Sequence, residues 1–332
     1  MVQSFAANTN TGLVRKANED RIAIILNVIQ PKNKQPKLRE EDWPKIQIFA
    51  VYDGHGGNQC AEYLKEHLHN NIIMNQNFPH NVQQAIVDGS KKTDSAYVKK
   101  CFDEYRVTNE IRNCKSGSCA NLVMTYNDDI FIINVGDSRA IGSKNHGAVA
   151  LDLSMDHKPS DHSEFRRIEA AGGHIYQTHS MKNASGIPFL QQIRVPKPPD
   201  EKYSMDNPLI GPHRVFPGRL SVCRTFGDLE AKQPELGGNP NVVICDPDVN
   251  YQKDGCKKLD YVLTCSDGIF DKLSTQQVHD IIWATIDRML TNGRPCSLHK
   301  IVGACVDEVL HASARSNSMD NISVVMIALE PL

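Results

Sequence analysis

The segment Val51-Tyr52-Asp53-Gly54-His55-Gly56-Gly57 closes an apolar run, Ile46–Tyr52, whose aliphatic and aromatic residues favour a β-strand. It therefore places a carboxylate and three glycines at the end of a strand. On its own, an Asp-Gly pair more often marks a turn than a binding site. A glycine beside a carboxylate also lets a backbone carbonyl approach a metal ion, so both interpretations stay open at this point.

Four more carboxylate clusters flank other apolar runs. They are Ser266-Asp267-Gly268 after Asp260–Cys265, Gly136-Asp137-Ser138 after Ile130–Val135, Asp320-Asn321 before Ile322–Leu329, and Asn18-Glu19-Asp20 before Arg21–Leu26. Several carboxylates repel one another unless cations lie between them. Because oxygen ligands suit Mg²⁺ or Mn²⁺, the five clusters together predict a two-metal hydrolase centre.

The rest of the pattern favours helices packed outside antiparallel sheets. A hairpin is expected where Asn127-Asp128-Asp129 joins the runs Ala120–Tyr126 and Ile130–Val135. Helical spacing of apolar residues covers Gln59–Ile73, Val82–Phe102, 278–290 and 298–310, with a Gly/Pro break between the last two.

Two stretches interrupt this pattern. Residues Gln30–Pro44 are polar and basic and are interpreted as a loop between strands. Tyr176–Pro217 holds seven of the 17 prolines, so regular structure throughout it is not expected. A loop of this length is typical of a functional lid or a disordered segment.

Composition excludes several classes of protein. With 37 basic and 39 acidic residues the net charge is -2, which argues against a general nucleic-acid binder. No apolar run is long enough to cross a membrane, and the first twenty residues lack the apolar region of a signal peptide. We therefore expect no membrane association and a location in the cytoplasm, with the nucleus as a second location. The ten scattered cysteines are expected to be free buried thiols; a zinc site or a disulfide framework is the alternative.

Taken together, the motifs resemble the metal-dependent protein Ser/Thr phosphatases of the protein phosphatase 2C family. The matching segments occur in the family's order, which makes a chance match implausible: Gly12–Asp20, Val51–Gly57, Ser116–Ser118, Asn134–Arg139, Asp156–Pro159, Glu169–Gly173, Gly218–Asp228, Ser266–Asp271 and Asp320–Ser323. The resemblance implies an α+β fold, a four-layer αββα sandwich of two antiparallel β-sheets flanked by antiparallel helix pairs. It also implies one catalytic domain over residues 1–332 with an enlarged flap at about 176–217. No coiled-coil pattern is present, so a monomer is expected.

The resemblance also implies roles for the matching residues. Asp53 would bridge two Mg²⁺ or Mn²⁺ ions, with the Gly54 carbonyl on one ion and Asp267 and Asp320 on the other. Glu19 and Asp20 would reach the ions mainly through water. A third, weaker ion in some members uses the positions of Asp137, Asp267 and Asp271. A water held between the ions is the nucleophile, its pKa lowered by both charges.

Two further residues would handle the substrate, a protein phosphorylated on serine or threonine. Arg15 matches the arginine that holds the phosphate, for which a planar fork of donors is well suited. His55 matches the proposed general acid, since an imidazole can protonate an alkoxide near neutral pH. Outside this context a surface arginine and a structural histidine are the simpler interpretations. Lys158 is interpreted as structural.

The sequence also departs from the family's pattern. Cys119 stands where threonine is common and Cys223 where serine is usual, which bears on packing or redox sensitivity. The flap is longer than usual and mildly basic, so it either favours acidic phosphoproteins or is a solvated insertion without a role. Two other functions remain to be separated from an active phosphatase: a pseudophosphatase that only binds a partner, and a metal nuclease or phosphodiesterase. The expected ligands and Arg15 are all present, and the surface charge does not suit a nuclease.

Overall fold

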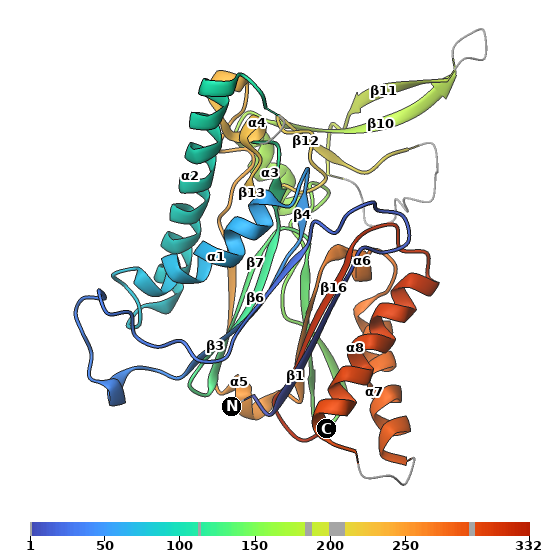
Figure 1. Cartoon of the computed structure of the whole chain (residues 1–332). Helices are drawn as coiled ribbons and strands as arrows, with labels where there is room; N and C mark the ends of the chain where they lie inside the picture. Colours follow the sequence, from blue (N-terminus) through green and yellow to red (C-terminus); the bar gives the residue numbers. More distant parts are fainter. Residues whose placement is uncertain (1, 112–113, 183–187, 199–209, 292–295) are drawn as a thin grey trace.

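Two five-stranded antiparallel sheets form the centre of the molecule (Figure 1). The computed structural model describes residues 2–111, 114–182, 188–198, 210–291 and 296–332. One sheet has the order β14-β7-β6-β3-β2, and the other has the order β1-β16-β15-β8-β9. Their strands are β1 Ser4–Asn10, β2 Arg21–Ile25, β3 Ile46–Tyr52, β6 Ala120–Tyr126, β7 Asp129–Val135, β8 Arg139–Lys144, β9 Val149–Asp152, β14 Asp248–Gln252, β15 Tyr261–Cys265 and β16 Ile322–Ala328.

A pair of long helices covers the outer face of each sheet. The helices α1 Gln59–Met74 and α2 Val82–Thr108 lie on the first sheet, and α7 Thr275–Thr291 and α8 Leu298–Arg315 lie on the second. The expected αββα sandwich is therefore confirmed. The chain begins and ends at the same end of the sandwich, marked N and C in Figure 1.

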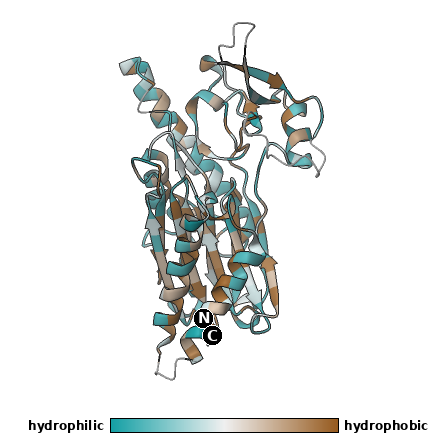
Figure 2. Cartoon of the chain, turned by 90° about the vertical axis from the view of Figure 1, so that its right-hand side faces the viewer, coloured by the Kyte–Doolittle hydropathy of each residue, from teal (hydrophilic) through white to brown (hydrophobic). Residues whose placement is uncertain are grey.

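The side chains of the central strands alternate between two apolar layers. In β3, Ile46, Ile48, Ala50 and Tyr52 belong to the core under α1 and α2, whereas Phe49 and Val51 belong to the core between the sheets. In β16, the even-numbered Val324 and Met326 lie under α7 and α8, and Val325 and Ile327 lie between the sheets. Successive side chains of a strand point to opposite faces, so a strand buried on both faces must be apolar throughout. Figure 2 shows many brown residues along the central strands and a mixture of teal and brown residues on the helices.

The hairpin and the four long helices agree with the sequence prediction. Tyr126 pairs with Asp129 across the turn, where Asn127 takes a left-handed conformation (φ 54°) that asparagine tolerates well. Helix α2 runs six residues further than expected, to Thr108, and its C-cap residue Asn109 is also left-handed (φ 54°). In the stretch 30–44, interpreted as a loop, one 3₁₀ turn spans Glu40–Asp42.

The flap differs from the expected loop because it contains a three-stranded sheet, β11-β10-β12. Its strands are β10 His174–Lys182, β11 Pro188–Arg194 and β12 Arg214–Phe216. Two of the prolines explain how strands form here: Pro188 is the first residue of β11, and Pro217 follows β12 directly. Proline is tolerated at such positions because no ladder hydrogen bond is lost. The hairpin of β10 and β11 projects from the body of the molecule in Figure 1. The expectation of a single catalytic domain with this insertion stays a prediction.

The remaining elements are short, apart from α3. They are β4 Gly54–His55, β5 Gly117–Ser118, β13 Phe226–Gly227, α3 His162–Ala170, α4 Leu229–Lys232, α5 Gly255–Lys258, α6 Asp267–Phe270 and a 3₁₀ turn at Pro234–Leu236. All ten cysteines are free and nine of them are buried, as expected. Within the described part of the chain, no helix combines the length and apolar character needed to cross a bilayer.

Candidate metal centre

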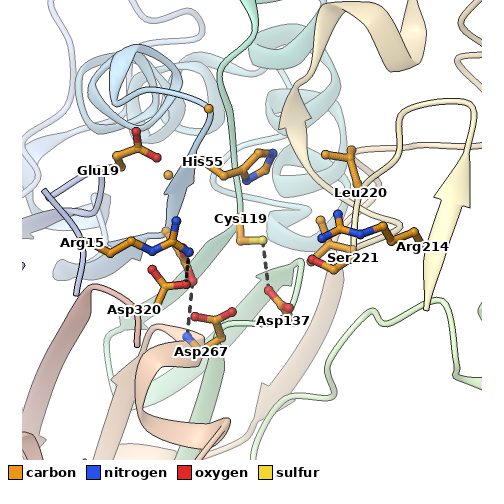
Figure 3. Close-up of a pocket in the computed structure, with 14 residues that line it drawn as sticks. Arg15, Glu19, His55, Cys119, Asp137, Arg214, Leu220, Ser221, Asp267 and Asp320 are labelled. Carbon is orange, nitrogen blue, oxygen red and sulfur yellow. Dashed lines mark hydrogen bonds and ion pairs between the residues drawn. The ribbon is translucent and has the colours of Figure 1, made fainter. Parts of the chain in front are cut away.

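A pocket of about 310 Å³ opens at one end of the two central sheets, where several strands end (Figure 3). Eight of the ten predicted site residues line it: Arg15, Glu19, Asp53, Gly54, His55, Asp137, Asp267 and Asp320. They come from segments far apart in the sequence. The sandwich therefore brings together most of the side chains that sequence reasoning singled out.

Three carboxylates form the floor of this pocket. One oxygen each from Asp53, Asp137 and Asp267 lie within 4.8 Å of one another, a grouping that can hold a metal ion. Asp53 Oδ2 accepts hydrogen bonds from Ser138 Oγ and from the backbone N–H of Asp267, both at 3.3 Å. These two weak contacts leave much of the negative charge uncompensated.

The electrostatics of the cluster reflect that shortage of positive charge. Burial raises the pKa of Asp53 well above its usual value, and the charges of Asp267, Asp20 and Asp137 raise it further. Burial and the charge of Asp137 likewise raise the pKa of Asp267. The charged forms of these groups are disfavoured without a cation, so the pocket is built to attract one.

Close backbone packing explains the glycines beside the carboxylates. A Cβ on Gly54 would lie 2.4 Å from the backbone oxygen of Glu19, and a Cβ on Gly268 would lie 2.0 Å from that of Asn321. Real side chains do not reach such distances. Glycine is thus required at Gly54, after β3, because the backbone of Glu19 approaches it closely. It is required at Gly268, after β15, because the backbone of Asn321 does the same.

The loop that bears Arg15 is hydrogen-bonded to the segment Asp320-Asn321, which directly precedes β16. The side chain of Asn321 donates to the backbone oxygens of Thr11 (2.8 Å) and Ala17 (3.0 Å) and accepts from the N–H of Glu19 (2.9 Å). Across this junction Arg15 Nη2 contacts Asp320 Oδ2 at 2.5 Å. Arg15 thus lies at the pocket with its charge paired to one of the expected metal ligands.

Two predicted residues do not line the pocket. Asp20 is buried behind it, where Ser323 Oγ donates to Oδ2 at 2.6 Å, and burial raises the pKa of Asp20 to about 6. Asp271 is half exposed and lies 3.3 Å from Lys158 Nζ, which is also 3.5 Å from Asp156. Lys158 thus contacts two carboxylates, consistent with the structural role expected for it.

His55 has a partner that sequence reasoning missed. Its Nε2 lies 3.0 and 2.9 Å from the two oxygens of Asp228, which is only 6% exposed. Burial lowers the pKa of His55, but the charge and hydrogen bond of Asp228 outweigh that effect and raise it overall. Asp228 is the last residue of Gly218–Asp228, one of the segments that match the family's pattern. That match was the one feature of the sequence that could have identified Asp228 as a site residue.

Six lining residues were not predicted as site residues, and two of them, Cys119 and Arg214, bear directly on the charge of the pocket. Cys119 Sγ donates to Asp137 Oδ1 at 3.3 Å, so the cysteine that replaces the common threonine contacts the carboxylate cluster directly. Arg214, from flap strand β12, lines the pocket across from Arg15 in Figure 3, and its Nη1 donates to the backbone oxygen of Arg219 at 2.7 Å. The flap therefore contributes one cation to the pocket.

The chain matches the family model described as Protein phosphatase 2C over residues 9–321. It is 30% identical over 246 residues to Probable protein phosphatase 2C 52 of Oryza sativa subsp. japonica, covering 74% of this chain and 40% of that protein. It is 29% identical over 282 residues to Probable protein phosphatase 2C 69 of Arabidopsis thaliana, covering 85% of this chain and 61% of that protein. The chain thus spans 40 to 61% of the length of these two curated relatives.

Solved structures show the same fold. A serine-threonine phosphatase 2C from Toxoplasma gondii superimposes with a TM-score of 0.63 at 19% identity, covering 98% of this chain and 94% of that one. A Caenorhabditis elegans sex determining protein gives a TM-score of 0.67 at 20% identity, covering 98% of this chain and 65% of that one. At these identities the likeness concerns the fold alone.

Proposed function

The chain belongs to the protein phosphatase 2C family, and from that premise we propose that it is a metal-dependent phosphatase acting on phosphoserine and phosphothreonine in proteins. One observation carries the proposal. Carboxylate oxygens of Asp53, Asp137 and Asp267 lie within 4.8 Å of one another, in the same pocket as Arg15 and His55. A cation site, a phosphate-binding guanidinium and an imidazole are the three groups that this hydrolysis needs.

The donor set suits Mg²⁺ or Mn²⁺ because it consists of oxygen atoms with excess negative charge. For two ions we propose the ligands Asp53, the Gly54 carbonyl, Asp267 and Asp320, with Glu19 and Asp20 acting through water. When bound, the ions would neutralise phosphate charge and lower the pKa of a water. For a third ion, Asp137 and Asp267 lie together, but Asp271 would first have to leave Lys158.

Arg15 would exchange partners on substrate binding. Its guanidinium is half exposed and contacts Asp320, so it can release that carboxylate to a cation and take the substrate phosphate instead. His55, at the same pocket, would give a proton to the departing serine or threonine oxygen. Each residue thus has a carboxylate partner in the protein: Asp320 for Arg15 and Asp228 for His55.

A pseudophosphatase that only binds a partner is the alternative. Such a protein is expected to have lost a metal ligand, whereas Asp53, Asp267 and Asp320 are all present in this sequence. A nuclease would need a basic surface around the pocket, which the net charge of -2 does not favour. Action as a monomer in the cytoplasm or nucleus stays a prediction.

The test is hydrolysis of p-nitrophenyl phosphate and of a phosphothreonine peptide with Mn²⁺, with Mg²⁺ and with EDTA. We expect turnover of both substrates with either metal and none with the chelator. A matched measurement on a bis(p-nitrophenyl) phosphate diester should show much slower turnover. Metal binding without hydrolysis of either monoester would support the pseudophosphatase, and preference for the diester would support a phosphodiesterase.

A further inference from the structure

The contact between His55 and Asp228 joins two segments that are 173 positions apart. It depends on the small sheet β13-β5-β4, in which His55 pairs with Gly117 and Gly117 pairs with Gly227. Both oxygens of the Asp228 carboxylate face His55 Nε2, at 2.9 and 3.0 Å. A buried carboxylate aimed at one imidazole nitrogen is the arrangement that orients a histidine ring.

Asp228 is itself firmly held. Its backbone N–H donates to the Ser116 oxygen at 3.2 Å, and the N–H of the preceding Gly227 donates to Asp94 Oδ1 at 2.8 Å. Asp94 also forms a buried ion pair with Lys232, whose Nζ lies 2.8 Å from both carboxylate oxygens. The carboxylate that faces His55 therefore extends from a backbone held by two hydrogen bonds, one of them to a carboxylate that is itself fixed by Lys232.

The chain leaves room for this contact at Gly117. A Cβ on Gly117 would lie 2.0 Å from Asp228 Oδ2 and 2.4 Å from His55 Nε2. Any other residue in the middle of Ser116-Gly117-Ser118 would therefore push the two side chains apart. The glycine of this motif is explained by the His55–Asp228 contact and by nothing in the carboxylate cluster.

We propose that Asp228 is the positioning residue for His55: it accepts the Nε2 hydrogen and thereby directs Nδ1 into the pocket, toward the leaving oxygen of the substrate. The inference rests on the proposed function. In the reaction the bond between phosphorus and the serine or threonine oxygen breaks, and that oxygen takes the proton from Nδ1. The attacking water supplies the new oxygen on phosphorus, and a proton released from it through solvent restores His55.

The experiment compares two leaving groups. A serine or threonine alkoxide needs a proton, whereas p-nitrophenolate leaves without one, so loss of the acid is selective for the peptide. We expect His55→Ala to lower kcat on the phosphothreonine peptide by ~100-fold or more and Asp228→Asn by ~10–100-fold. On p-nitrophenyl phosphate the loss in each variant should be at least about tenfold smaller than on the peptide. The double variant should lose no more than His55→Ala, because Asp228 acts through His55.

Matched variants separate positioning from damage to the fold. Gly117→Ala should reproduce the selective loss, whereas Gly303→Ala, on α8 with open space around the new methyl, should not. Asp103→Asn, at an exposed ion pair with Lys99, is the control for the lost charge. Stabilisation by added Mg²⁺, measured as a rise in Tm, should be the same in Asp228→Asn as in the wild type.

Each other outcome has a defined meaning. If the wild type fails on both monoesters, the proposed function is wrong, and the inference goes with it. If the wild type is active and Asp228→Asn loses activity equally on both substrates, or shows no loss, Asp228 does not position His55. Additive losses in the double variant would also overturn the inference.

Discussion

Two groups of buried or partly buried charges in the described part of the chain are compensated in opposite ways. In the first, Glu164 of α3 lies between Arg224 and Arg167, with contacts of 2.5 and 2.8 Å. Burial raises the pKa of Glu164, but hydrogen bonds from the two arginines outweigh it and bring it to about 2. In the second, the carboxylates around Asp53 face one another, and burial raises the pKa of Asp53 well above its usual value.

The presence or absence of balancing positive charge distinguishes a structural carboxylate from one that binds a cation. The charge on Glu164 is balanced by the chain itself, so the α3 cluster can be complete without any added group. The pocket is short of positive charge: of the two arginines that line it, Arg15 is paired with Asp320, and Arg214 donates to the backbone oxygen of Arg219. Buried like charges are retained at a cost in stability where function needs them.

The largest expected effect comes from removing one charge in the pocket. Asp53→Asn should lower kcat on p-nitrophenyl phosphate by ~10³-fold or more, because metal binding loses its central ligand. In EDTA, however, the Tm of the variant should equal or exceed that of the wild type, since repulsion with Asp267 is relieved. Activity within about tenfold of wild type, or a large loss of apo stability, would contradict the assignment.

The opposite pattern is expected in the α3 cluster. Glu164→Gln leaves Arg167 and Arg224 without their shared anion and should lower the free energy of unfolding by about 3 kcal/mol. The kcat of the protein that remains folded should stay within about twofold, because α3 does not line the pocket. The matched control on the same helix is Glu169→Gln, at an exposed contact with Arg194, with an expected change below about 0.5 kcal/mol. Urea denaturation measures both, and equal losses would remove the distinction.

A pH measurement sharpens the comparison. Asp20 has a raised pKa of about 6, above the unfolded value of about 4. Between these values the folded state binds more protons than the unfolded state, so Asp20 makes metal-free stability fall as the pH rises from about 4 to 6. The pKa of Glu164 is lowered to about 2, so its contribution is present above about pH 4.5 and is lost as the pH falls toward 2.

The Asp20 contribution can be isolated by comparing the metal-free wild type with Asp20→Asn. The free energy of unfolding of the variant should decline less between pH 4 and 6, and the two curves should converge near pH 4. Saturating Mg²⁺ should abolish most of the difference in slope, because a bound cation favours the charged carboxylate. Parallel curves throughout this range would contradict the proposed origin of the effect.

Most of the central sandwich was predictable because the apolar pattern of each strand or helix is visible in its own residues. Strands such as β3 and β16 are apolar on both faces, and α7 and α8 repeat their apolar residues every three or four positions. Four strands of the two sheets, β1, β8, β9 and β14, were not predicted. In β8, Gly142 and Ser143 interrupt the apolar pattern, although both are buried. A Cβ on Gly142 would lie 2.9 Å from Leu153, so tertiary packing, and not strand propensity, selected that glycine.

The site was predictable only as far as its motifs reach. Each carboxylate stood in a recognisable segment, but the pairing of His55 with Asp228 and of Arg15 with Asp320 depends on contacts more than 170 positions apart in sequence. The flap hairpin was missed because polar residues interrupt β10 and because β11 begins at a proline. Arg214 therefore stood among several basic flap residues, with nothing in the sequence to single it out.

The smallest predicted effect concerns this contribution of the flap to the pocket. Arg214 lies at the pocket rim, whereas Arg194 of β11 is exposed and contacts Glu169 on α3. The guanidinium of Arg214 is expected to contact acidic residues near the phosphorylated position of a substrate. Arg214→Gln should therefore raise KM for an acidic phosphopeptide by ~3–5-fold, equivalent to about 1 kcal/mol. On p-nitrophenyl phosphate the variant should stay within about twofold, because that substrate has no flanking residues.

Arg194→Gln, the same substitution in the same flap, should leave both values unchanged. The wild-type KM for the acidic peptide should rise with salt and that of Arg214→Gln should rise less, since exposed charges are screened over ~8–10 Å. A neutral phosphopeptide should bind the wild type and Arg214→Gln alike. Equal effects of the two arginines, or a wild-type KM that ignores salt, would show that the charge of the flap does not reach the substrate.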